Sequence, residues 1–270
     1  MIGVGAVPSV AVGQRALLIR SPSGNVLWDC VGYLDDDLAA EIEDLGGISA
    51  IAVSHPHFYG VMTEWGRAFD VPVYVHAADR DWVGRPDPVI EYWTGDTHRI
   101  APGMTLINAG THFAGGTVLH WADDPEGRGA LFSGDIFMVV MDRRWVSFMY
   151  SVPNFIPERP STIRRALALV EPFAFERIYG AFWGRVVSTD GAAAVQRSAE
   201  RYLRFVAENG SSAEPGRTGV RSQGPAASER ASPHIRPPRP PTRPNLRGHS
   251  ASVPHVPRTA HVDRGRCAAR

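Results

Sequence analysis

Two histidines separated by a single residue come directly after an apolar stretch. His55 and His57 follow the segment ISAIAV at 48–53, which is short and apolar and is therefore expected to form a buried strand. In an extended or loop segment, side chains two residues apart project to the same side, so both imidazoles can reach one ion. Pro56 between them restricts the backbone and helps to hold the loop in one shape. The pair predicts part of a metal site.

Two further polar residues also follow expected strands. His112 lies in the segment GTHFAGGT at 110–117, whose glycines allow a tight loop beside a charged centre. Asp135 follows the apolar segment 130–132, where its carboxylate can bind an ion or orient and deprotonate a water for catalysis. Each feature alone is more typical of an ordinary loop histidine or turn aspartate. Together they predict one site for zinc, with iron or manganese as alternatives, formed by His55, His57, His112 and Asp135.

Several other polar side chains have ordinary structural explanations. His76 and His120 lie at or in expected strands, where a single hydrogen bond each would satisfy them. Asp29 either orients the metal ligands without binding the ion itself or caps a turn. Cys30 is expected to be a small buried side chain and not a reactive thiol. Tyr59 either donates a hydrogen bond into the site or fills space beside it.

The elements that must position these residues alternate between strands and helices. An apolar strand is expected at 10–12, and a hairpin from 15–20 and 26–28, which a turn-forming SPSGN segment joins. A helix is expected at 35–45, with acidic residues in its first turn, and a loop at 84–98. In α/β proteins, functional side chains collect where strands end, as the four candidates do here. The pattern predicts a layered α/β fold with sheets between helices.

The order of these motifs resembles that of the metallo-β-lactamase superfamily over most of residues 10–205. The segment SHPHFYG at 54–60 resembles the signature Thr/Ser-His-x-His-x-Asp-His. Residues 110–117 resemble the family's Gly-His loop, and Gly134-Asp135 resembles its Gly-Asp after a strand. Residues 15–29 are similar to its opening hairpin, which ends near an aspartate. The resemblance implies a four-layer αββα sandwich and a metal-dependent hydrolase.

The chain departs from the family pattern where that pattern provides a second metal site. The family has Asp and His after the His-x-His pair, whereas this chain has Tyr59 and Gly60. The family also has a late Gly-His motif, but the matching stretch YGAFWG at 179–184 contains no histidine. The ligands of the first site are retained and those of the second are lost. The resemblance therefore implies one ion per chain.

Two functions follow from this site. In the first, the chain is a hydrolase whose single zinc ion lowers the pKa of a bound water toward about 7, for attack on a small-molecule ester, thioester or amide. Phosphodiester cleavage by a two-metal clamp is disfavoured because the second site is lost. In the second, the chain is a non-catalytic metal-binding or regulatory protein on the same fold. The sequence identifies no substrate.

Composition changes at about residue 210. Residues 1–210 hold nearly all the periodic apolar sequence and are expected to form one domain. Residues 211–270 hold 10 of the 22 prolines and 11 arginines against 3 acidic residues. Such a segment buries too little apolar surface to offset the entropy of the chain, so it is expected to be a disordered tail. A chain ending near Gly210 is accordingly expected to keep its melting temperature and its metal.

Composition also argues against several other functions. Every basic residue is arginine, which excludes a lysine Schiff base, and the two cysteines make neither a disulfide framework nor a cysteine zinc site. The basic tail has no aromatic residue to stack on a base, so no nucleic-acid partner is expected. No stretch approaches the roughly 20 apolar residues of a membrane span, and no signal peptide is evident. We expect a cytoplasmic protein.

Overall fold

The structure, a computed structural model, describes residues 1–208 and 259–263. These residues belong to one compact unit that contains two mixed sheets. The first sheet has the strand order β17-β1-β2-β3-β4-β5-β6, with parallel pairing from β3 to β6. Its strands are β1 (Ile2–Val7), β2 (Ala16–Ile19), β3 (Val26–Trp28), β4 (Ala50–Ala52), β5 (Val73–His76), β6 (Ile90–Trp93) and β17 (Thr259–Asp263).

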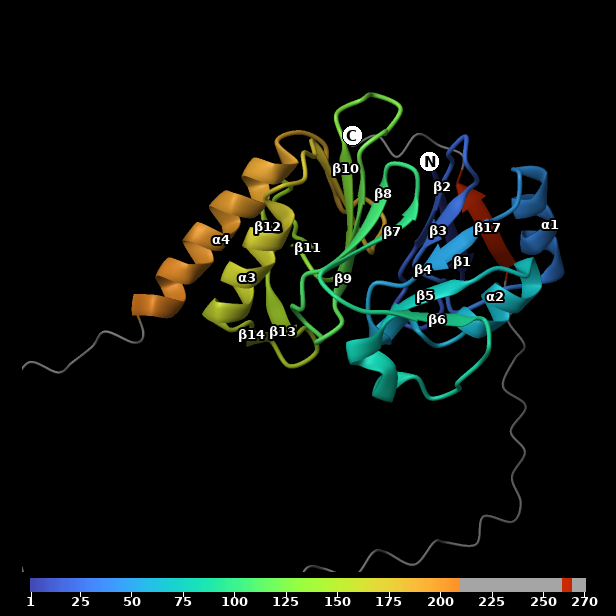
Figure 1. Cartoon of the computed structure of the whole chain (residues 1–270), viewed down its shortest axis with the longest axis horizontal. Helices are drawn as coiled ribbons and strands as arrows, with labels where there is room; N and C mark the ends of the chain where they lie inside the picture. Colours follow the sequence, from blue (N-terminus) through green and yellow to red (C-terminus); the bar gives the residue numbers. More distant parts are fainter. Residues whose placement is uncertain (209–258, 264–270) are drawn as a thin grey trace, which may run out of the picture. The chain divides into compact units, whose positions relative to one another are not determined.

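The second sheet has the strand order β16-β15-β10-β9-β8-β7 (Figure 1). Its pairs are antiparallel except for β10 with β15. Two small two-stranded sheets, β11 with β12 and β13 with β14, follow β10 in the chain. The bounds are β7 (Thr97–Ala101), β8 (Met104–Asn108), β9 (Thr117–Trp121), β10 (Ala130–Gly134), β11 (Met138–Val139), β12 (Val146–Ser147), β13 (Met149–Ser151), β14 (Ile156–Pro157), β15 (Arg177–Gly180) and β16 (Val186–Val187).

The helices begin and end where the local sequence favours it. In α1 (Asp36–Asp44) the Asp35 side chain accepts a hydrogen bond from Leu38 N–H, which caps the helix as an N-terminal aspartate should. In α3 (Pro160–Val170) the proline stands at the first turn, where its missing N–H costs nothing. The other helices are α2 (Met62–Phe69), α4 (Gly191–Glu208) and the short 3₁₀ segments η1 (Pro56–Phe58) and η2 (Ala77–Trp82).

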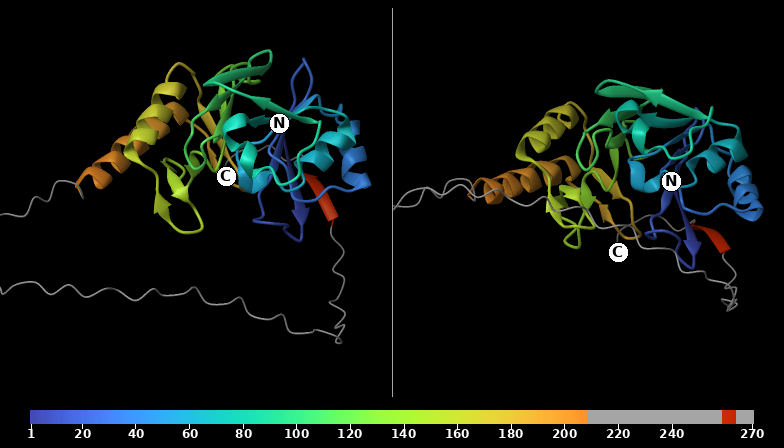
Figure 2. Two further views of the ribbon diagram at one scale, coloured as in Figure 1. Left: turned by 60° about the horizontal axis from the view of Figure 1, so that its bottom comes forward. Right: turned by 90° about the horizontal axis from the view of Figure 1, so that it is seen from below.

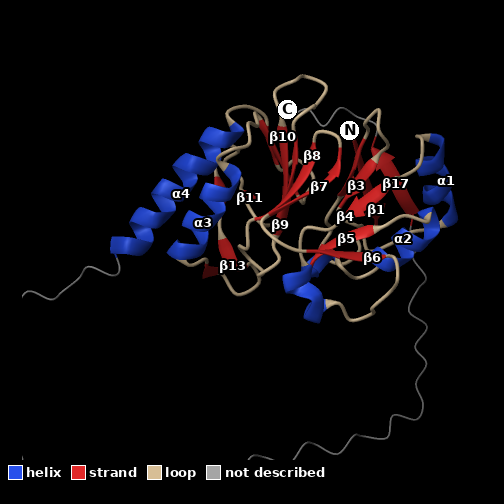
Figure 3. Ribbon diagram, in the orientation of Figure 1, coloured by secondary structure: helices blue, strands red, loops and turns tan. Residues whose placement is uncertain are grey.

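Three apolar layers join the sheets and helices. Alternate residues of β2 point to opposite faces, so that Leu18 packs toward α1 and α2 while Leu17 packs toward the second sheet. In β10, Phe132 lies between the sheets and Leu131 packs toward α3 and α4. Figure 2 and Figure 3 show the helices outside the two sheets, α1 and α2 on one side and α3 and α4 on the other. The αββα sandwich that the family resemblance implies is confirmed.

Two expectations about the strands are wrong. The expected strand at 10–12 is a turn, and β1 lies earlier, because Pro8 lacks the N–H that a strand in the middle of a sheet must donate. The expected loop at 84–98 contains β6 and the start of β7. Its prolines and aspartates gather near 85–88, whereas Ile90–Trp93 carries the branched and aromatic side chains that favour a strand. None of the helices in the described ranges is long and apolar enough to cross a bilayer.

Five residues of the expected tail form a strand. β17 pairs antiparallel with β1 from Gly3 opposite Asp263 to Val7 opposite Thr259, and Val262 packs against the core of the first sheet. The edge of β1 offers free backbone groups, and the β-branched residues of Thr-Ala-His-Val-Asp suit pairing there. This corrects the expectation that 211–270 is uniformly a tail. The other residues of that range lie outside the described part of the chain.

We therefore expect removal of β17 to lower the stability of the domain. A chain ending at Pro257 loses the β1 ladder and the packing of Val262, which together should contribute about 1 to 2 kcal/mol, or roughly 2 to 8 °C in melting temperature. A chain ending at Gly210 also lacks β17 and should lose at least this amount, and we expect neither truncation to change metal affinity. Thermal unfolding of both against the full chain decides this, and a Pro257 chain that melts with the full chain would contradict it.

Candidate metal centre

The first two histidines are placed by β4 and the 3₁₀ turn that follows it. His55 keeps extended backbone angles, and Pro56 then starts η1, which contains His57. The convergence of the two imidazoles therefore comes from a tight turn, the loop alternative of the extended or loop segment that the sequence predicted. His55 is fully buried and His57 is exposed. The pair thus presents one ligand at the base of the site and one at its mouth.

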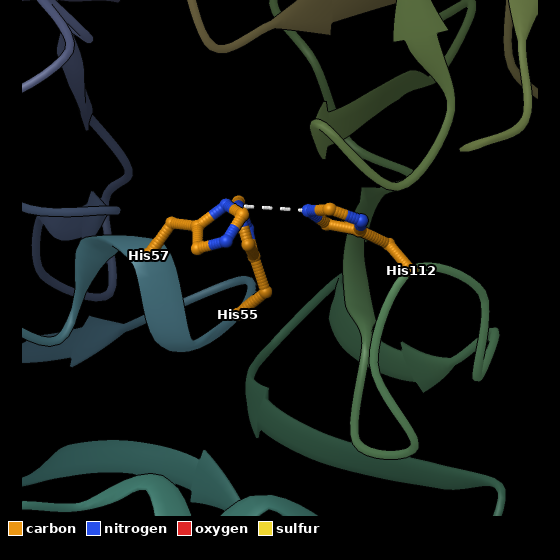
Figure 4. Close-up of side chains that lie close together, drawn as sticks. All are labelled: His55, His57 and His112. Atoms are coloured by element: carbon orange, nitrogen blue, oxygen red, sulfur yellow. Dashed lines mark hydrogen bonds between the residues drawn. The ribbon is translucent and has the colours of Figure 1, made fainter. Parts of the chain in front are cut away.

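His112 reaches the pair from the loop between β8 and β9. One ring nitrogen from each of the three histidines lies within 4.8 Å of the others, and Figure 4 shows the rings turned toward a common point. The His112 Nε2 and His57 Nδ1 atoms are 3.3 Å apart. Two nitrogens bound at about 2.05 Å to a tetrahedral zinc ion are separated by about 3.3 Å. The spacing of these two nitrogens therefore fits shared coordination of an ion.

The innermost histidine has one ring nitrogen engaged and one left over. His55 Nδ1 lies 2.8 Å from Ser54 Oγ, whereas His55 Nε2 is buried with no hydrogen-bond partner. A buried, unpaired nitrogen costs free energy that a bound cation would offset. When the ring binds through Nε2, Nδ1 carries the proton and donates it to Ser54 Oγ, which fixes the ring orientation. The Ser54 hydroxyl thus orients the His55 ring through a hydrogen bond, a role that the sequence did not reveal.

The protonation states of the histidines favour metal binding. Burial lowers the pKa of His55 well below its usual value, and the neighbouring His112 and His57 lower it further. His57 is exposed at the mouth of the site, and the partial desolvation of its ring there also lowers its pKa. Burial, together with the neighbouring His57, lowers the pKa of His112. All three rings are therefore neutral at pH 7 and hold a lone pair for an ion. Protons compete for them only in more acidic solution.

Asp135 lies beside this cluster at the end of β10. Its Oδ2 is 3.9 Å from His55 Nε2, and its Oδ1 is buried without a hydrogen-bond partner. Burial raises the pKa of Asp135 to about 6. The carboxylate is therefore next to the ligand set, but outside the three-residue group whose ligand atoms converge. Its roles as a ligand and as a catalytic residue stay predictions.

Of the two roles that the sequence left open for Asp29, the structure shows support of the segment that carries His55, and not only the capping of a turn. It is buried, and its Oδ1 accepts the Ser54 N–H at 2.7 Å, directly before His55. Burial raises the pKa of Asp29 to about 7, since the hydrogen bonds from Ser54 offset only part of the desolvation. The carboxylate ties the end of β3 to the start of the His-x-His turn. The sequence alone left this role open.

The remaining histidines of strands β5 and β9 are satisfied within the fold. His76 Nδ1 accepts the Ala78 N–H, and its Nε2 lies 3.1 Å from the Gly95 carbonyl oxygen. His120 Nε2 lies 2.8 Å from the Ala174 carbonyl oxygen. Neither belongs to the convergent group. Cys30 is buried as expected, and burial raises its pKa, which makes the thiolate less available.

The positions of the family's second metal site hold apolar or aromatic groups. Tyr59 is buried in the core of the first sheet, and burial raises the pKa of its phenol. Ala181, in the stretch that lacks the late histidine, is also buried there, and its N–H donates to the Gly134 carbonyl oxygen at 3.3 Å. The burial of Tyr59 among apolar side chains favours the space-filling role of the two that the sequence left open.

Sequence similarity to known proteins identifies the family of the chain. Residues 10–168, more than half of the chain, match the sequence profile of the Metallo-beta-lactamase superfamily. The chain belongs to this superfamily. The Uncharacterized protein YmaE of Bacillus subtilis (strain 168) is 49% identical over 197 residues, which are 73% of this chain and 72% of the relative. Members are typically metal-dependent hydrolases, and His55, His57 and His112 form a group that could hold a metal.

Solved structures resemble the chain in fold. The peroxy diiron species of the chemotaxis sensor ODP matches with a TM-score of 0.50 at 18% identity, covering 72% of this chain and 86% of that one. A B3 metallo-beta-lactamase with an active-site glutamic acid matches with a TM-score of 0.49 at 18% identity, covering 74% and 85%. At such identities the likeness concerns the fold.

The geometry distinguishes His112 from two other histidines that lie in strands, His76 in β5 and His120 in β9. We expect His112→Ala to weaken metal affinity by well over the 10- to 100-fold typical of losing a supporting residue, because it removes one of three converging nitrogens. His76→Ala and His120→Ala should leave the affinity near wild type and affect only stability. Competitive chelator titration of the three variants measures this. Wild-type affinity in His112→Ala, with loss in either control, would overturn the site.

Proposed function

We propose that the chain is a hydrolase that holds one zinc ion on His55, His57 and His112 and cleaves a small-molecule ester, thioester or amide. The observation that carries the proposal is the buried, unpaired Nε2 of His55, turned toward two further imidazole nitrogens that lie 3.3 Å apart. Three imidazole ligands are typical of a catalytic zinc site, because they leave a coordination position for water or substrate. A single ion is proposed because Tyr59 and Gly60 stand where the family binds the second.

The residues around the histidines suit catalysis on a small molecule. When bound, zinc would polarise a substrate carbonyl and lower the pKa of a coordinated water. Asp135, buried beside His55, would accept a proton from the attacking water and later deliver it to the leaving group. A cavity of about 170 Å³ adjoins the site, with His112 in its wall and the aromatic rings of Phe113 and Tyr150 beside it. Its size suits a small acyl group.

Aromatic side chains around the site would exclude water from the reacting groups. The Phe113 ring lies 5.1 Å from that of His57 and 5.3 Å from that of the exposed Trp82. A second cavity of about 210 Å³ lies beside η1, the turn that contains His57, and Tyr59, Trp82 and Arg85 are among the residues that line it. Apolar surface near the reacting atoms strengthens electrostatic effects there.

The proposal predicts about one metal ion per chain. Plasma emission spectrometry of protein purified without chelator, at a known concentration, measures the stoichiometry and the element together. Zinc near one equivalent is expected, because one converging set of three ligands is present among the described residues. Iron and manganese are quantified in the same run, since the fold neighbour ODP is described with a diiron species. A reproducible value near two would contradict the single site.

Asp135→Asn is expected to lower kcat/KM by about 10² to 10⁴ on any substrate found with a panel of nitrophenyl esters, thioesters and anilides, because the amide cannot accept the proton. Wild-type activity should vanish with chelator. It should also fall as the pH drops toward and below about 6, where the carboxylate of Asp135 becomes protonated. Asp142→Asn, at an exposed aspartate outside the site, is the control. Full metal occupancy with no activity on the whole panel would favour the non-catalytic function instead.

A further inference from the structure

The loop that carries His112 has no regular secondary structure to fix it. Residues 109–116 connect β8 to β9, and His112 itself adopts a positive φ of 68°, which a residue with a side chain rarely takes. The loop closes on itself through the hydrogen bond from Gly110 N–H to the Gly116 carbonyl oxygen. That contact shapes the loop but does not orient it against His55 and His57. The position of the third ligand therefore depends on contacts from outside the loop.

One such contact comes from Glu158, two residues before the start of α3. Glu158 is only 5% exposed, and its Oε2 accepts the backbone N–H of His112 at 3.0 Å. Its Oε1 accepts the Arg159 N–H at 2.8 Å. The His112 ring is held as well, since its Nδ1 lies 3.1 Å from the Tyr150 carbonyl oxygen. Glu158 thus ties the backbone of a metal ligand to the half of the sandwich that contains α3.

A second buried carboxylate holds the same loop from the other half. Asp79, in η2 after β5, is 0% exposed, and its Oδ1 accepts the Gly115 N–H at 2.7 Å. Gly115 permits this approach, because a Cβ there would lie 2.7 Å from the Asp79 carboxyl carbon. β5 pairs with β4, the strand that leads into His55 and His57. Asp79 therefore sets the His112 loop against the sheet that carries the other two ligands.

The burial of the Asp79 carboxylate lowers the stability of the fold. Its Oδ2 is buried and has no hydrogen-bond partner, so this carboxylate satisfies one backbone donor while leaving half of its own acceptor capacity unused. Burying such a group without a partner lowers the stability of the fold, so its presence points to a role other than folding. The purpose that fits its position is the orientation of the His112 loop.

We propose that Asp79 and Glu158 are positioning residues of the metal centre, which together fix His112 at coordinating distance from His55 and His57. The inference rests on the proposed function, because it presumes that the three histidines hold an ion. Neither carboxylate belongs to the converging ligand group. Both act through backbone N–H groups of the loop, at Gly115 and at His112 itself. Their loss should loosen the third ligand and leave the other two in place.

The test compares metal affinity in matched variants of the full chain. Asp79→Ala and Glu158→Ala should each weaken zinc affinity by about 10- to 100-fold in competitive chelator titration. Asp79→Asn should have a zinc affinity close to that of the wild type. Its amide oxygen can accept the Gly115 N–H, and its amide nitrogen replaces an oxygen that has no hydrogen-bond partner. Glu158→Gln should restore zinc affinity only in part, since both Glu158 oxygens accept N–H groups.

Asp124→Ala controls for a general loss of stability. Asp124 is also a buried carboxylate, and its Oδ1 accepts the N–H groups of Arg128 and Gly129 in the β9–β10 loop, at the end of these strands away from the site. This variant should melt at a lower temperature with unchanged zinc affinity. Cobalt-substituted protein gives a second readout, because its visible spectrum reports ligand geometry and should change in Asp79→Ala and Glu158→Ala but not in Asp124→Ala.

The outcomes separate this inference from the proposed function. A wild-type protein that takes up no zinc or cobalt defeats the proposed function. A wild-type protein that binds metal, with affinity and spectrum retained in Asp79→Ala and Glu158→Ala, defeats the positioning role alone. An equal loss of affinity in Asp124→Ala would also overturn it, since the effect would then be general. If the alanine variants do not fold, the amide variants decide the question. Wild-type affinity and an unchanged spectrum in Glu158→Gln would contradict the role of Glu158. A loss of affinity in Asp79→Asn would contradict the role of Asp79.

Discussion

The close approach of Gly134 to Ser54 joins the ends of the two sheets, and the geometry of the candidate metal centre depends on it. Gly134 has a φ of 51°, and a Cβ at this position would lie 2.5 Å from Ser54 Oγ. Without that side chain, the end of β10 reaches the end of β4, so that Asp135 comes to lie beside His55. Any larger residue would push the strand ends apart and separate the carboxylate from the histidines.

Ser54 is the residue through which the surrounding contacts converge. Its N–H donates to Asp29, its hydroxyl pairs with the His55 ring, and its carbonyl oxygen accepts the Thr117 N–H at 2.9 Å. These bonds link β3, β4 and β9 within a few ångströms of the innermost ligand. Backbone geometry on both sheets thus holds the imidazoles together without any ion, so the candidate site is preorganised.

The parts of the site that sequence could predict are those whose signal is local. His55 and His57 follow an apolar run, and His112 stands among glycines, so residue type, neighbours and the order of the motifs together select them. The layered fold is likewise visible in alternating strand and helix patterns. Asp79 and Glu158 were not identified, because neither stands in a motif and each bonds to a residue far away in the sequence. Asp79 is 36 residues from its partner Gly115, and Glu158 is 46 residues from its partner His112. Contacts of this kind depend on tertiary packing, which local patterns do not encode.

The pairing of β17 with β1 also has a consequence for the order in which the chain folds. Gly3 and Asp263 are neighbours in the sheet, although they lie near opposite ends of the described sequence. During synthesis the first sheet can assemble from β1 to β6 long before residues 259–263 have left the ribosome. Until then the open edge of β1 can pair with a strand of another chain, so a nascent or stalled polypeptide is the form most exposed to misassembly. The arrival of β17 closes that edge and ends the exposure.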